Sequence, residues 1–187
     1  LSVMRRVLVL SPPTTIARDF IDYPYFADLG AVQLAAVLRA QLGAVSLIDA
    51  FALDSATLHF RRDGRGHLGA SVDEVLTRVE AIEPPEAVVV TVAPFHPPPH
   101  PDDVLAAVLR GVRSIHPSAR IVLADAYQSG QHYVETGDAL LASYPEARAW
   151  LKYEAEASIL DALEADGVLR GAPPDLDALP PPAWDLV

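Results

Sequence analysis

The residues best suited to chemistry in this sequence stand directly after short apolar runs. Hydroxyl, carboxylate, amide and aromatic side chains follow five such runs, and lysine and arginine are absent from these positions. They offer hydrogen-bond donors and acceptors without positive charge, which suits a large, mostly apolar ligand better than a triphosphate. The five segments are Ser11-Pro12-Pro13-Thr14-Thr15, Asp49-Ala50-Phe51, Ala93-Pro94-Phe95-His96, Asp125-Ala126-Tyr127-Gln128-Ser129-Gly130 and Tyr153-Glu154-Ala155-Glu156.

The apolar runs themselves predict buried β-strands, because both faces of each run are apolar. The runs are Val7–Leu10, Val45–Ile48, Ala87–Val92, Ile121–Ala124 and the weaker Ala149–Lys152. Helical patterns separate them, at Gly30–Leu42, Val72–Ile82, Asp102–Ser114, Glu135–Ser143 and Ala155–Asp166. This alternation predicts an α/β, Rossmann-like fold: an open, mostly parallel five-stranded sheet with helices on both faces.

One segment interrupts the alternation. Thr57–Ala70 alternates apolar and charged residues around Asp63-Gly64, which predicts a small hairpin excursion. In an open parallel sheet, ligands bind outside the carboxyl ends of the strands. Taken singly, each of the five segments is better explained by strand termination and helix capping than by ligand binding, but their convergence on one edge of the sheet favours a ligand site there.

Composition excludes several classes of function. The chain of 187 residues has no cysteine, so it holds no disulfide, thiolate zinc site or cysteine-ligated iron–sulfur cluster of its own. Its net charge of −11 argues against a nucleic-acid partner. It has no phosphate-binding G-x-x-x-x-G-K-[ST] or G-x-G-x-x-G motif and no G-x-S-x-G nucleophile elbow. The first apolar run is too short for a signal peptide or membrane span, so we expect a cytoplasmic protein without a membrane partner.

The last 17 residues, GAPPDLDALPPPAWDLV, are the most unusual stretch. Proline fixes φ and lacks a donor, so this segment is expected to be extended. Trp184, Leu186 and Val187 are costly to leave in water, which predicts that the tail docks on an apolar surface. That surface belongs either to this domain or to a further domain that the tail leads into.

Several motifs, in this order and spacing, resemble the N-terminal cobalamin-binding domain of the B12-dependent radical SAM enzymes. VLVLSPP is similar to that family's first strand and Pro-Pro loop, and Tyr23-Pro24 with Leu29-Gly30 is similar to its entry to the first helix. Leu42–Ala50 resembles the second strand with its aspartate. WLKYEAEASILDALE stands where the family has a Gly-Glu-Gly-Glu entry to the last helix, and DLDALPPPAWDL resembles its linker to the radical SAM barrel.

The resemblance, which covers nearly the whole chain, implies a cobalamin-binding domain over residues 1–170 and a proline-rich linker over 171–187. It implies that Ser11, Thr14 and Thr15 hydrogen-bond the nucleotide tail of the cofactor, that Ala93, Pro94 and Phe95 face the corrin, and that Glu154 meets corrin amides. Tyr127, Ser129 and Gly130 would line the tail cavity or the corrin edge. The full set of implied cofactor-binding residues is Ser11, Pro12, Pro13, Thr14, Thr15, Asp49, Ala93, Pro94, Phe95, Asp125, Ala126, Tyr127, Gln128, Ser129, Gly130, Tyr153 and Glu154.

The chain also departs from that family. Asp125-Ala126-Tyr127-Gln128 replaces paired glycines and Pro-His, and Tyr153-Glu154-Ala155-Glu156 replaces Gly-Glu-Gly-Glu. The Asp-x-His-x-x-Gly motif that supplies a lower-axial histidine is absent. Without cysteine the chain is not catalytic alone, so the 4Fe-4S cluster and S-adenosylmethionine would belong to a radical SAM domain in cis or in trans. The resemblance implies that this chain holds the corrinoid for a radical SAM domain of methyltransferase type. The alternatives are an interaction module that has lost the cofactor and, ranked last, a stand-alone small-molecule enzyme.

Overall fold

A computed structural model describes residues 5–18, 27–93, 101–125 and 139–187. Its strands are β1 (Arg6–Ser11), β2 (Thr14–Ile16), β3 (Ala44–Asp49), β4 (Thr57–Phe60), β5 (Gly66–Gly69), β6 (Ala87–Val92), β7 (Arg120–Asp125), β8 (Ala149–Lys152) and β9 (Gly167–Arg170). Its helices are α1 (Leu29–Leu42), α2 (Val72–Ala81), α3 (Asp103–Ile115), α4 (Ala139–Ala142) and α5 (Ile159–Ala162), with short 3-10 turns η1 (Leu176–Ala178) and η2 (Trp184–Leu186).

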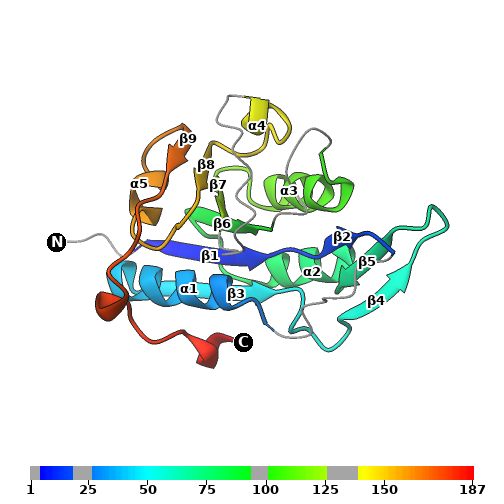
Figure 1. Cartoon of the computed structure of the whole chain (residues 1–187), viewed down its shortest axis with the longest axis horizontal. Coiled ribbons are helices and arrows are strands. Elements are labelled where there is room, and N and C mark those ends of the chain that lie inside the picture. Colours follow the sequence, from blue (N-terminus) through cyan, green and yellow to red (C-terminus); the bar gives the residue numbers. More distant parts are fainter. Residues whose placement is uncertain (1–4, 19–26, 94–100, 126–138) are drawn as a thin grey trace.

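The main sheet has six parallel strands in the order β3-β1-β6-β7-β8-β9 (Figure 1). The α/β, Rossmann-like class is therefore confirmed, and the five strands expected from the apolar runs are all present. The sixth strand, β9, was missed because Gly167–Arg170 has only four residues and directly follows a helical pattern. It pairs with β8 at the edge of the sheet, from Ala149↔Gly167 to Lys152↔Arg170.

Side chains that alternate along the central strands build two separate cores. Val7, Val9 and Val89 face α1, α5 and the tail, whereas Leu8, Leu10 and Val88 face α2 and α3. All six side chains are at most 2% exposed. Burying a side chain of this size stabilises the fold by about 1.5–3 kcal/mol. Apolar side chains of β1 and β6 therefore stabilise the packing of helices on both faces of the sheet.

The helices begin at the polar residues that the sequence places before them. Asp28, Ser71 and Asp102 cap α1, α2 and α3, each accepting a hydrogen bond from a backbone N–H of the first turn. Two expected helices differ from their predicted lengths. Of Ala155–Asp166 only α5 is helical, because Ala155 and Glu156 turn inward and become buried against the first core instead of starting the helix. The predicted helix Glu135–Ser143 lies partly outside the described residues.

The predicted hairpin is present and belongs to a second, antiparallel sheet. β4 and β5 pair with each other as expected, and β2 adds to β5 on its other side, from Thr14↔Leu68 to Ile16↔Gly66. Thr14 and Thr15, expected in a loop, thus lie in a short strand. This small sheet extends from the carboxyl end of β1, beside the edge where a ligand is expected (Figure 1).

The tail docks on this domain, along α1 (Figure 1). Ala183 is fully buried and donates its N–H to the carbonyl of Val32, and Gln33 Nε2 donates to the carbonyl of Pro180 at 2.9 Å. Leu179 and Leu186 pack against the first core. Trp184 and Val187 remain 51% and 55% exposed, so the described part of the chain does not cover these two side chains.

Within the described part of the chain, no helix has the length and apolar character needed to cross a membrane. The longest, α1, has 14 residues.

Candidate functional site

The carboxyl edge of the main sheet is where the strand order reverses. β1 lies between β3 and β6, so the chain leaves β1 toward one side and later returns to pair on the other side. In doubly wound folds this switch point opens a crevice between neighbouring strands, and ligands bind there. Any group placed after β1 or β6, or at the start of α1, therefore lies at the position in this fold best suited to a ligand.

Asp28 joins the two strands that border this switch point. Its Oδ2 accepts hydrogen bonds from Ser11 Oγ at the end of β1, at 3.5 Å, and from Thr91 Oγ1 in β6, at 3.3 Å. Its Oδ1 accepts from the Gly30 N–H at 3.0 Å, which makes Asp28 the N-cap of α1. One carboxylate thus ties β1, β6 and a helix N-terminus together.

Asp49, at the end of β3, lies against Asp28. The Asp28 backbone N–H donates to Asp49 Oδ2 at 2.6 Å, and the Phe51 N–H donates to Asp49 Oδ1 at 2.9 Å. Asp49 is 3% exposed. Burial raises its pKa to about 6, against the two hydrogen bonds that lower it, and the charge of Asp28 raises it further. Burial also raises the pKa of Asp28, so at the switch point burial disfavours the charged form of both carboxyls.

A second polar cluster follows on the same edge, around Asp125 at the end of β7. Its Oδ1 accepts from Trp150 Nε1 at 3.0 Å, and its Oδ2 accepts from the Tyr153 N–H at 3.1 Å. Trp150 is 1% exposed, so its indole N–H is satisfied inside the fold. Asp125 thereby fixes the loop that leaves β8.

That loop contains a tyrosine, Tyr153, with a backbone conformation that residues other than glycine rarely adopt. Tyr153 has φ 69°, the only non-glycine residue with positive φ in the described part of the chain. The left-handed region is unfavourable for a residue with a Cβ, and such strain gathers at functional sites. Lys152 directly before it is 3% exposed, with its Nζ 5.8 Å from the centre of the Tyr153 ring.

The structure brings several of the sequence-predicted residues together. Ser11, Asp49 and Ala93 lie at or beside the Asp28 cluster, and Asp125, Tyr153 and Glu154 form the neighbouring part of the edge. Pro12 and Pro13 are buried and lead into β2, which holds Thr14 and Thr15. Pro94, Phe95, Ala126, Tyr127, Gln128, Ser129 and Gly130 lie outside the described residues.

Two residues at this edge were missed from the sequence, Asp28 and Thr91. Asp28 precedes a helix instead of following a strand, and only its N-cap position before Leu29-Gly30 signalled it. Thr91 lies inside an apolar strand, where a hydroxyl gives no signal of its own. Elsewhere at this end of the fold, Thr14 Oγ1 is buried without a hydrogen-bond partner.

Across the described ranges, no group of three or more histidine, aspartate and glutamate residues has the arrangement of a metal site. The described edge offers a ligand hydroxyls, carboxyls and backbone groups, together with the small residue Ala93 and the buried Lys152 at the end of β8. Such a set can accept hydrogen bonds from amide or hydroxyl groups of a neutral ligand. At the switch point, the buried carboxyls of Asp28 and Asp49 disfavour an anionic group of a ligand.

Comparisons with known proteins give only remote similarities. No family model matches the chain, and no curated protein matches it. Among solved structures, it is similar to phosphomethylpyrimidine kinase from Clostridium difficile 630, with a TM-score of 0.43 and 12% identity over 82% of this chain and 62% of the kinase. It is also similar to ribokinase from Giardia lamblia, with a TM-score of 0.32 and 12% identity over 86% of this chain and 61% of that one. The chain thus spans about three fifths of the length of these structures, and the low scores carry no functional argument.

Proposed function

We propose that this chain is a cobalamin-binding domain that holds the corrinoid at the carboxyl edge of its main sheet for a radical SAM domain in cis or in trans. The observation that carries the proposal is the backbone of Tyr153, which has φ 69°. In the family that the sequence resembles, this position is the first glycine of Gly-Glu-Gly-Glu. Glycine adopts positive φ without cost, so the chain keeps a glycine-like turn although the glycine itself is replaced.

The sheet order supports the same proposal. Counted along the main sheet, the strands follow the order 2-1-3-4-5 of flavodoxin-like folds, with one further strand at the edge. In folds of this order ligands bind at the switch point, which here lies between β1 and β6, where Ser11, Asp28 and Thr91 meet. The proposal assigns this crevice to the cofactor.

The described residues fit the cofactor's chemistry. A corrin ring carries neutral amide side chains, whose N–H groups need acceptors and whose carbonyls need donors. Asp49, Asp125 and Glu154 supply acceptors in the proposal, the hydroxyl of Ser11 serves as either, and the unpartnered hydroxyl of Thr14 gains a partner from the nucleotide tail. Ala93, half-buried just after β6, leaves room for the face of the ring.

In this proposal the chain binds, orients and shields the cofactor. Methylcobalamin, when bound, supplies the methyl group, and bond chemistry belongs to the cofactor and to the radical SAM partner. The net charge of −11 argues against a nucleic-acid partner. We also propose a cytoplasmic location and no membrane partner, in keeping with the described helices.

Retention of hydroxocobalamin tests the proposal directly. The full chain is mixed with the cofactor and desalted, and the visible spectrum is recorded; we expect about one corrin per chain, by the proposal's single crevice. Ala93→Trp should block the rim and abolish retention, because its side chain would occupy the space over the ring. Ala81→Trp is the matched control, since Ala81 is exposed at the far end of α2, and it should retain the cofactor.

A folded parent chain, verified by far-UV circular dichroism, that retains no corrin would contradict the proposal. That result would favour the alternative of an interaction module without cofactor. Retention that is equal in the parent and Ala93→Trp would place the cofactor somewhere other than the carboxyl edge.

A further inference from the structure

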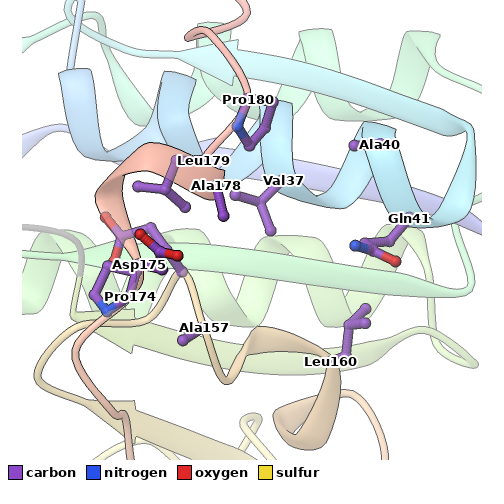
Figure 2. Close-up of a pocket in the computed structure, with 11 residues that line it drawn as sticks. Val37, Ala40, Gln41, Ala157, Leu160, Pro174, Asp175, Ala178, Leu179 and Pro180 are labelled. Carbon is purple, nitrogen blue, oxygen red and sulfur yellow. The ribbon is translucent and has the colours of Figure 1, made fainter.

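A groove of about 360 Å³ lies away from the carboxyl-edge site, between α1, the segment around α5 and the docked tail (Figure 2). We call it the tail groove. Its lining residues are Val37, Ala40, Gln41, Glu156, Ala157, Leu160, Pro174, Asp175, Ala178, Leu179 and Pro180. A volume of this size is within the range of small-molecule sites, which is about 300–1,000 Å³.

Three parts of the chain, far apart in sequence, build the walls. Figure 2 shows Val37 of α1 close to Ala178 and Leu179 of the tail, with Leu160 and Ala157 on the opposite border. These side chains give the groove an apolar body. Because the tail forms one wall, the groove exists only while the tail is docked.

Its ionisable side chains are both acidic. Glu156 and Asp175 line the groove, and none of its described lining residues is a lysine, arginine or histidine. Asp175 already has a structural role, because its Oδ1 accepts from the Asp177 N–H at the start of η1. Glu156 is therefore the lining carboxylate that remains for a ligand.

Glu156 is also incompletely satisfied. It is 8% exposed, and its Oε2 is buried without a hydrogen-bond partner. A buried acceptor left unpaired costs about 1–3 kcal/mol, and an orphan group of this kind calls for a water, ion or ligand. A donor that reaches Oε2 from the groove would remove this cost.

We propose that the tail groove binds a small aliphatic ammonium ion, with its hydrocarbon chain against Val37, Leu160 and Leu179 and its ammonium group at Glu156. One carboxylate in an apolar groove suits a single ammonium group better than a metal ion, which requires several oxygen or nitrogen ligands. The proposal does not depend on cobalamin binding at the carboxyl edge.

Binding at this groove would be linked to docking of the tail. The ligand contacts α1 and the tail at once, so it binds only the docked state. Free ligand at a hundred times its dissociation constant would shift the docking equilibrium about a hundredfold toward the docked tail. Hydrogen exchange at the Ala183 N–H, which bonds to Val32 on α1, reports on that equilibrium.

The test is a titration of the full ¹⁵N-labelled chain at pH 8 with n-hexylammonium, n-hexanol and n-hexanoate, followed by amide chemical shifts. Burial, with a contribution from the charge of Glu154, raises the pKa of Glu156, so the titration is run at pH 8, where a carboxyl with a raised pKa is more fully ionised than at neutral pH. We expect shifts at Ala40, Ala157 and Ala178, with n-hexylammonium binding most tightly and n-hexanoate not binding. n-Hexylammonium should also slow exchange at the Ala183 N–H.

Glu156→Gln should weaken n-hexylammonium binding about tenfold or more, because it removes a charged hydrogen bond. It should leave n-hexanol binding unchanged, which also shows that the groove is intact. The matched control is Asp161→Asn, which removes an exposed charge on α5 outside the groove lining and should have no effect. Equal weakening by both variants, equal affinity of the ammonium and the alcohol, or shifts spread over the acidic surface would each overturn the proposal.

Discussion

The raised pKa of Asp49 makes a testable link between the switch point and stability. Asp49 is almost fully buried, and burial raises its pKa from the ordinary 3.8 to about 6. The folded chain therefore holds this proton more tightly than the unfolded chain does. Protonation of Asp49 therefore stabilises the folded chain. This stabilisation is fully present below about pH 4 and is lost as the pH rises through about 6.

The size of the effect follows from the two pKa values. The difference between 3.8 and about 6 corresponds to a limit of about 3 kcal/mol. Over the accessible window from pH 7 to pH 5, linkage gives a gain of about 1.3 kcal/mol in the free energy of unfolding. The charge of Asp28 is part of the cause, so the two carboxyls titrate as a coupled pair.

Urea unfolding at pH 5, 6 and 7 measures this term against Asp49→Asn, which cannot titrate at that position. The difference in unfolding free energy between the two proteins cancels the titration of distant groups. We expect that difference to move by about 1.3 kcal/mol in favour of the parent on going from pH 7 to pH 5. A difference that stays flat with pH, or moves the other way, would refute the reasoning.

Two further predictions concern the loop after β8 and the start of the tail. Gly171→Ala should destabilise the chain by about 2 kcal/mol, because a Cβ at position 171 would lie 1.9 Å from the Glu154 carbonyl oxygen. It should also speed hydrogen exchange at the Ala183 N–H. Exchange at the parent's rate would show that Gly171 does not anchor the tail. In urea unfolding, Tyr153→Gly should be more stable than Tyr153→Ala by about 1 kcal/mol. Both variants remove the ring, but only glycine adopts positive φ without strain. Equal stability would mean that the backbone of the alanine variant shifts to a negative φ at this position.

Most of the main sheet could be predicted because β1, β6, β7 and β8 are buried on both faces and the edge strand β3 is still an apolar run. Ala87–Val92 and Ala149–Lys152 form strands with the predicted bounds, and the other three runs extend by one residue at each end. β9 could not be predicted in this way, since it lies at the sheet edge and none of its residues is fully buried. β2 was missed for a related reason: its pairing partner, β5, is more than fifty residues away.

The candidate site was predictable as a place but not as a set of contacts. Parallel strands put Ser11, Asp49 and Asp125 on one edge, which follows from the alternation of strands and helices alone. The contact between Asp28 and the hydroxyl of Thr91 depends on how α1 enters above the sheet. The two residues are 63 positions apart, and no local sequence pattern signals their contact. The positive φ of Tyr153 was likewise hidden, since tyrosine is not a residue that predicts a left-handed turn.

The docked tail has a practical consequence for anyone dividing this chain into parts. A version ending after β9, at Arg170, would keep every strand of the main sheet, yet it would uncover the surface of α1 that Ala183, Leu179 and Leu186 now cover. Exposed apolar surface of this kind promotes self-association. The boundary for expressing this domain by itself therefore belongs after the tail, although the last strand ends well before it.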